Sequence, residues 1–113
     1  MKRFLPISYR DFCDVPRMFV VSDGESTYLL ECRFDEGLDE FPPHYNVCQM
    51  PGLAEIDLDG SWEDLSKRAV RRLGQVSVSD VQFDETRRRK IDGSILEQFQ
   101  RQNDSGSTKM NTE

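Results

Sequence analysis

The segment from Gly60 to Gly74 constrains the fold most, because it carries the signals of a helix at both ends. Ser61 is typical of an N-cap, since its hydroxyl can accept a hydrogen bond from a free N–H group of the first turn. Gly74 is the residue type that most often closes a helix in the left-handed conformation. Apolar side chains recur between them at a helical period: Trp62, Leu65, Ala69 and Leu73. The pattern predicts a main helix over about 61–73, with Trp62 buried on its apolar face.

Alternation of apolar and polar side chains predicts strands around this helix. Residues 17–22 and 27–34 flank Asp23-Gly24, a dipeptide typical of a tight hairpin. Residues 45–50 predict a third strand, and residues 53–59 and 76–83 are weaker candidates. Apolar side chains of the second strand share one face, which should meet Phe19 and Val21 in the core: Tyr28, Leu30, Cys32 and Phe34.

These elements predict an α+β domain. We expect an antiparallel β-meander of three to five strands, with the main helix packed on it and a short C-terminal helix from Ser94 to Phe99. A small SH3-like or OB-like barrel is the alternative, because short twisted strands can close on themselves. The 113 residues suit one domain, expected over 1–102. Residues 103–113 offer little to bury, so they predict a disordered tail.

The composition favours a cytoplasmic protein. Hydrophobic residues make up 36% of the chain, and no apolar run approaches the roughly 20 residues that cross a membrane. The first residues meet Pro6 and then polar positions, which is not the pattern of a secretory signal. Three cysteines without a C-x-x-C pair favour free thiols over a disulfide scaffold or a zinc ribbon.

Charge is unevenly distributed along the chain. Residues 1–60 hold 5 basic and 12 acidic side chains, a net charge of −7, whereas residues 61–113 hold 10 and 9, a net charge of +1. An acidic half favours basic protein partners and repels nucleic acid.

A basic stripe in the second half is the candidate anion-binding site. It combines residues 67–72, on the polar face of the predicted helix, with residues 87–90. The side chains in question are Arg68, Arg71, Arg72, Arg87, Arg88, Arg89 and Lys90. However, Glu63 and Asp64 precede Lys67 and Arg68 by four residues, and such pairs are typical of a solvated helix face. Nucleic-acid or polyanion binding is therefore the alternative function rather than the favoured one.

Two further groups of residues are candidates for binding. Acidic residues and the only histidine gather in the loop 35–44, where a divalent metal could serve a metal-dependent enzyme: Asp35, Glu36, Asp39, Glu40 and His44. One histidine cannot supply a His pair, so a solvated acidic loop is the favoured interpretation and the metal-dependent enzyme a remote alternative, and we expect no metal or other cofactor. Ile91, Ile95 and Phe99 form an apolar stripe that needs a surface to lie on, either in the same chain or in a second copy.

No catalytic motif accompanies these candidates. One histidine, no nucleophile motif and no glycine-rich phosphate loop favour a non-enzymatic protein. The sequence therefore predicts a small protein–protein interaction or regulatory module that binds another protein or itself, as a homodimer.

Overall fold

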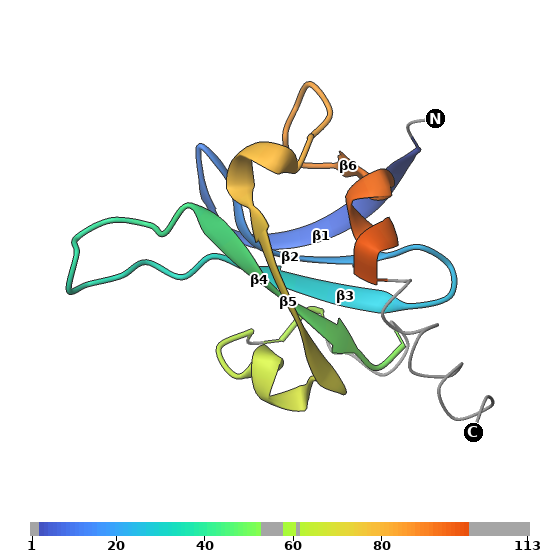
Figure 1. The fold of residues 1–113 in the computed structure, drawn as a ribbon, viewed down its shortest axis with the longest axis horizontal. Helices are drawn as coiled ribbons and strands as arrows, with labels where there is room; N and C mark the ends of the chain where they lie inside the picture. The colour runs from blue at the N-terminus through green and yellow to red at the C-terminus, as the bar shows by residue number, and fades with distance from the viewer. Residues whose placement is uncertain (1–2, 53–57, 61, 100–113) are drawn as a thin grey trace.

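The computed structural model describes residues 3–52, 58–60 and 62–99, and six of its segments form one antiparallel sheet (Figure 1). The strands are β1 (Phe4–Cys13), β2 (Val15–Ser22), β3 (Thr27–Glu31), β4 (His44–Met50), β5 (Arg71–Ser77) and β6 (Lys90–Asp92). Their order across the sheet is β5-β4-β3-β2-β1-β6. The first five strands are thus a meander, as expected, and the last strand returns beside the first. The chain is mostly β.

The hairpin between β2 and β3 forms where the sequence predicts it. Gly24 adopts a φ of 98°, which an L side chain rarely takes. One carboxylate oxygen of Asp23 accepts hydrogen bonds from the backbone N–H groups of Glu25 at 2.9 Å and Ser26 at 2.8 Å. These bonds fix the turn, and the turn sets the register of Val21 opposite Tyr28.

One face of the sheet carries the first core. The predicted inner face is confirmed for these residues of the first core: Phe19, Val21, Tyr28, Leu30 and Cys32. The chain that follows β5 crosses this face and completes the core with Val81, Ile91, Leu96 and Phe99 (Figure 1). Phe34 departs from the expectation, because its side chain is 45% exposed beyond the end of β3.

The opposite face carries a second core. It is formed by Met18, Val20, Leu29, Met50, Trp62 and Leu65. Trp62 is buried, as predicted, with 4% of its surface exposed. Because both faces are covered, all five residues of β3 are buried.

The main helix expected over 61–73 is wrong. Only Leu65–Arg68 forms a helical turn, the 3₁₀ helix η2, and Ala69 is already extended, with a ψ of 142°. The chain then enters β5, which pairs with β4. Leu65 packs in the second core whereas Leu73 packs in the first, on the other side of the sheet. The apolar residues therefore do not share one helix face, and strand pairing outweighs their helical spacing.

Gly74 has a different role from the helix cap that the sequence predicts. It lies within β5 with a φ of 147°, opposite Val47, where the register between β4 and β5 shifts. Leu73 is the extra residue between Arg72, which faces Cys48, and Gly74. Such a β-bulge favours glycine because the backbone leaves the usual strand conformation.

The edges of the sheet differ in part from what the sequence predicts. The sequence did not indicate β1, although it pairs with both β2 and β6. The sheet is open, with β5 and β6 as its edges, so the closed barrel is not formed. After the short 3₁₀ helix η3 (Val78–Asp80) and β6, the expected C-terminal helix begins as the 3₁₀ helix η4 (Gly93–Leu96), capped by the Asp92 carboxylate. The candidate strand 53–59 falls largely, and the expected tail 103–113 entirely, outside the described residues.

Candidate functional site

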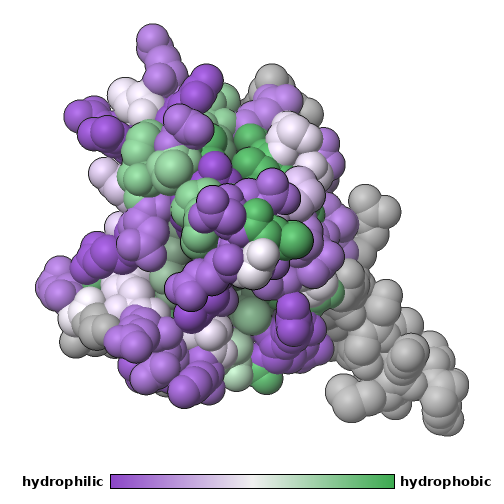
Figure 2. Space-filling view, turned by 90° about the vertical axis from the view of Figure 1, so that its left-hand side faces the viewer, coloured by the Kyte–Doolittle hydropathy of each residue, from purple (hydrophilic) through white to green (hydrophobic). Residues whose placement is uncertain are grey.

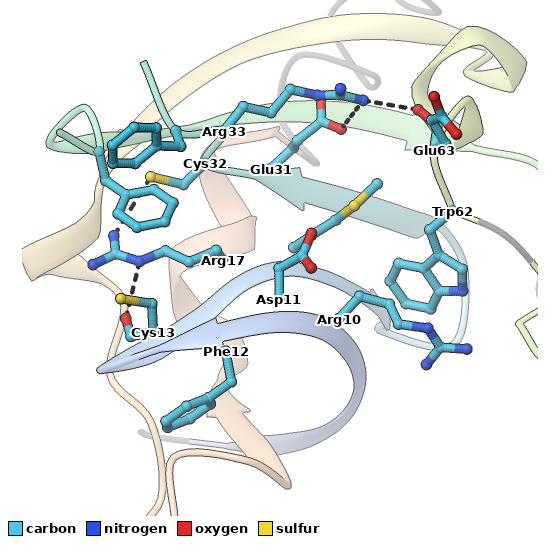
Figure 3. A pocket seen from close by; sticks show the side chains of 13 residues that line it. Arg10, Asp11, Phe12, Cys13, Arg17, Glu31, Cys32, Arg33, Trp62 and Glu63 are labelled. Atoms are coloured by element: carbon cyan, nitrogen blue, oxygen red, sulfur yellow. Dashed lines mark hydrogen bonds and ion pairs between the residues drawn. The ribbon is translucent and has the colours of Figure 1, made fainter. Parts of the chain in front are cut away.

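A pocket of about 680 Å³ opens where the β1–β2 hairpin meets the end of β3 (Figure 3). Its lining comes from the last residues of β1, the start of β2, the chain leaving β3, and the segment that covers the second core. The residues are Arg10, Asp11, Phe12, Cys13, Arg17, Met18, Glu31, Cys32, Arg33, Phe34, Phe41, Trp62 and Glu63. Three arginines and four aromatic rings are thus gathered around one hollow.

Arg17 ties three parts of the pocket together. Its Nε donates to the backbone oxygen of Cys13 at 3.0 Å, and one terminal nitrogen donates to the Sγ of Cys32 at 3.5 Å. The guanidinium carbon lies 4.2 Å from the centre of the Phe41 ring. Figure 3 shows the guanidinium between the two cysteines. A guanidinium carries five N–H donors, so Arg17 can still donate to a ligand.

Arg10 and Trp62 form a second fixed unit. The Arg10 guanidinium carbon lies 4.9 Å from the centre of the indole ring. Arg10 and the indole Nε1 both donate to the backbone oxygen of Leu58, at 2.7 Å and 3.0 Å. The cation–π contact and the shared acceptor hold both side chains in place before any partner arrives.

Arg33 forms an ion pair with the one buried carboxylate of the pocket. Its guanidinium nitrogen lies 2.8 Å from the Glu31 carboxylate, whose side chain is only 10% exposed. The same nitrogen donates to the backbone oxygen of Glu63 at 3.0 Å. The hydrogen bond with Glu31 raises the pKa of Arg33. Asp11 and Glu63 also line the pocket, so its three arginines are matched in number by three carboxylates.

Aromatic rings form the mouth of the pocket. Phe12 and Phe34 are 37% and 45% exposed, and Phe34 packs edge-on against Phe41 with ring centres 5.1 Å apart. The guanidinium of Arg88 covers Phe12 at 4.5 Å from the ring centre. Asp11 precedes Phe12 with a φ of 58°, a left-handed conformation that is uncommon for a residue other than glycine. Large apolar surface is therefore held open to solvent at this point.

The three cysteines are free thiols in different surroundings. Cys13 is exposed at the mouth of the pocket, Cys32 is buried at its floor, and Cys48 is half-buried on β4. Burial raises the pKa of the Cys48 thiol.

The predicted basic stripe is divided by the fold. Arg71 and Arg72 begin β5, whereas Lys90 begins β6, at the opposite edge of the sheet. Figure 1 shows the loop before β6 and the start of β5 at opposite ends of the molecule. Arg68 lies with β5, and Arg87, Arg88 and Arg89 lie in the loop with Lys90. The seven side chains therefore make two patches rather than one track.

The predicted apolar stripe of Ile91, Ile95 and Phe99 packs against the core of the same chain. Ile91 lies in β6 and is fully buried, and Phe99 is 2% exposed in the first core. Ile95 is half-buried against that core. An interface through these three side chains would require part of the core to open.

The acidic loop 35–44 projects as an arm between β3 and β4. Asp35 and Glu40 pair through two backbone hydrogen bonds, and His44 begins β4. Over the described ranges, no three histidine, cysteine, aspartate or glutamate side chains are grouped so that they could hold a metal ion.

The sequence did not indicate that the lining residues form a pocket, although it predicted that Trp62 is buried. Arg10, Arg17 and Arg33 are three of the five basic residues in the acidic half of the chain, and each stands beside apolar strand residues. That placement is a signal, but only the strand order brings them together.

Neither a protein family, a curated protein nor a solved structure matches this chain. Among the described residues, no helix has the length and apolar character needed to cross a membrane.

Proposed function

We propose that this protein is a non-enzymatic interaction module that binds a segment of another protein in the pocket at the end of β1, β2 and β3. The observation that carries the proposal is the lining of the pocket. Aromatic side chains, methionine and arginine are the residues enriched in the buried centre of protein interfaces. Tryptophan, tyrosine and arginine also dominate binding energy there. Eight of the thirteen lining residues are arginine, phenylalanine, tryptophan or methionine.

Prior ordering of these side chains supports the same function. Arg10, Arg17 and Arg33 each have fixed acceptors or an ion-pair partner within the chain. Binding therefore freezes few additional rotamers, and the entropy cost of association falls. The exposed faces of Phe12 and Phe34 lose contact with water when a partner covers them.

The dimensions suit a short peptide segment. Ligand pockets in proteins typically enclose roughly 300–1,000 Å³, and this one is about 680 Å³. The free thiols favour a reducing compartment, so the proposal includes a cytoplasmic location. Polyanion binding through residues 67–72 and 87–90 has less support, because its basic side chains stand on opposite edges of the sheet.

A capture experiment with matched variants tests the proposal. Tagged wild-type protein, the double variant Phe12→Ala/Phe34→Ala and the control Phe4→Ala are incubated with native extract, and captured proteins are quantified by mass spectrometry. Phe4 has an exposed fraction of 42%, similar to those of Phe12 and Phe34, but it does not line the pocket.

We expect a protein that is captured by the wild type and Phe4→Ala but lost by at least tenfold with the pocket variant. The same set of captured proteins with all three baits would refute the role of the pocket. Capture that depends instead on RNA in the extract, and disappears after ribonuclease treatment, would favour polyanion binding.

A further inference from the structure

The outer edge of β5 presents a basic surface with an apolar centre. We define the β5 surface as Lys67, Arg68, Val70, Arg71 and Arg72. Among the described residues, no strand pairs with β5 on the side away from β4. Val70 is 59% exposed, the second highest exposure of a large hydrophobic residue in the structure. Over the part of the chain that the structure describes, this edge of the sheet therefore has no strand beside it, and it exposes an aliphatic side chain near four basic residues.

Local contacts leave most of this positive charge at the surface. Lys67 pairs with Asp64 at 3.2 Å, but both side chains are more than 70% exposed, so the pair is readily exchanged. Arg72 donates to the amide oxygen of Asn46 at 2.9 Å, which orients the guanidinium without neutralising it. Arg71 is exposed.

The arm between β3 and β4 has the complementary character. We define the acidic arm as residues 35–40. The backbone N–H of Asp35 donates to the Glu40 oxygen at 2.8 Å, and the N–H of Glu40 donates back to the Asp35 oxygen at 3.2 Å. The turn between them exposes Leu38 by 68%, the highest value for a large hydrophobic residue in the structure. Four exposed acidic residues flank that leucine in the sequence: Asp35, Glu36, Asp39 and Glu40.

The position of the arm suits contact with another molecule. Figure 1 shows the arm extending away from the sheet, and Figure 2, which faces that side of the molecule, shows a largely hydrophilic surface with apolar patches. Over the described ranges, no basic side chain lies within ion-pair distance of Glu36, Asp39 or Glu40. The Asp35 carboxylate accepts hydrogen bonds from the backbone N–H groups of Gly37 at 2.9 Å and Leu38 at 3.2 Å, whereas the other three carboxylates of the arm have no ion-pair partner among the described residues.

We infer that the acidic arm of one copy docks on the β5 surface of a second copy, which docks its own arm in return. Each surface has residues of one charge sign before and after one exposed aliphatic side chain in the sequence. Leu38 would pack on Val70 while the carboxylates meet the arginines, and both pairs of surfaces would be buried at once. A two-fold dimer permits this, because residue i then contacts residue j while j contacts i. Opposite potentials also guide the two copies into register.

Charge exchange between two variants tests the inference in the full chain. Molar mass is measured by light scattering after size exclusion, at about 50 mM and about 500 mM salt. We expect a dimer at low salt that dissociates at high salt, since exposed charges are screened beyond about 10 Å at 0.1 M. Asp39→Lys/Glu40→Lys and Arg71→Glu/Arg72→Glu should each be monomeric at low salt.

An equal mixture of the two variants should recover the dimer, because the reversed arm of one then meets the reversed β5 surface of the other. The matched control is Glu25→Lys/Glu85→Lys, which makes the same change in net charge at exposed acidic residues outside the arm. It should remain dimeric, and circular dichroism establishes that each variant is folded. Leu38→Ser, which leaves the charge unchanged, should weaken the dimer at least tenfold.

A wild-type protein that is monomeric at low salt up to about 200 µM, a concentration that would populate even a weak complex, would overturn the inference. So would a dimer that survives both charge reversals. A mass that grows beyond the dimer with concentration would indicate head-to-tail chains and would overturn the reciprocal arrangement.

Discussion

Replacing Trp62 with alanine should remove the support that holds the chain segment after residue 58 against the sheet. Trp62 is 4% exposed and packs in the second core, which has six buried members among the described residues. Its indole N–H also donates to the Leu58 oxygen at 3.0 Å. The substitution therefore deletes a large buried ring, a hydrogen bond and the platform beneath the Arg10 guanidinium.

The magnitude follows from these three losses. Removing a buried tryptophan or phenylalanine side chain typically costs about 3–5 kcal/mol, because the apolar contacts disappear and a cavity remains. The hydrogen bond contributes about 1 kcal/mol and the cation–π contact roughly 0.5–1 kcal/mol, and much of both is contained in that total. We expect the free energy of unfolding to fall by about 3–5 kcal/mol. Trp62→Phe keeps most of the ring and should cost only about 1–2 kcal/mol.

Urea denaturation followed by far-ultraviolet circular dichroism measures the change. Fluorescence cannot serve, because Trp62 is the only tryptophan of the chain. With a slope of roughly 1.5 kcal/mol per molar urea, the midpoint should fall by about 2–3 M for the alanine variant. Val70→Ala is the control, with all variants measured at about 500 mM salt, where no dimer is expected; Val70 is 59% exposed and its loss should change stability by no more than about 0.5 kcal/mol.

A loss below about 1 kcal/mol for Trp62→Ala would refute this reasoning. It would mean that the second core is not a cooperative part of the fold and that the indole lies loosely on the sheet. A normal stability combined with lost capture of a partner would assign Trp62 to binding alone.

Three further predictions concern ionisable groups. Burial raises the pKa values of Tyr45, Tyr28 and Cys48, so each group holds its proton more tightly in the folded state than in the unfolded chain. The unfolded chain begins to lose these protons at about pH 9–10, so stability should be fully present below that range and fall as pH rises. Tyr45→Phe should reduce the loss of stability at alkaline pH, measured by melting at a series of pH values. It should also cost about 1–2 kcal/mol at neutral pH, because the Tyr45 hydroxyl donates to the Pro16 oxygen at 2.7 Å. An unchanged pH profile would show that Tyr45 does not cause the alkaline loss. Thiol titration of the native protein should modify Cys13 first, Cys48 more slowly and Cys32 only on unfolding, and a total below three in the unfolded chain would reveal a disulfide. Arg33→Met should lower the melting temperature more than Arg33→Met/Glu31→Met does, since the single change leaves the buried Glu31 carboxylate without its ion pair; equal losses would show that this carboxylate is solvated.

The strands that alternate regularly could be predicted from the sequence. The inner face of β2 and β3 follows from a period of two, and the hairpin follows from Asp23-Gly24, because both are properties of neighbouring residues. The same local reasoning fails for residues 62–76. Trp62, Leu65 and Leu73 have helical spacing, yet the first two face one core and the third faces the other. Pairing of β5 with β4 decides this, and no local pattern contains it.

The pocket is even harder to predict from local sequence patterns than the fold. The pocket depends on the Arg17 guanidinium reaching Cys13, Cys32 and Phe41, which come from three separate parts of the chain. The sequence instead drew attention to contiguous charges at 87–90, because a run of basic residues is visible without the fold. Of that run, Arg88 contacts the rim of the pocket through Phe12. The contacts of an isolated arginine such as Arg17 become evident only when the positions of the strands are known.

Burial of β3 on both faces limits how this protein can vary over evolutionary time. A strand with one solvent-exposed face tolerates almost any polar residue at every second position, so half of its positions can vary. In β3, the residues from Thr27 to Glu31 are buried on both faces of the sheet. Each substitution must fit a core of fixed volume, whichever side it lies on. Related chains should therefore share five consecutive residues of similar size here, even where the acidic arm differs in length.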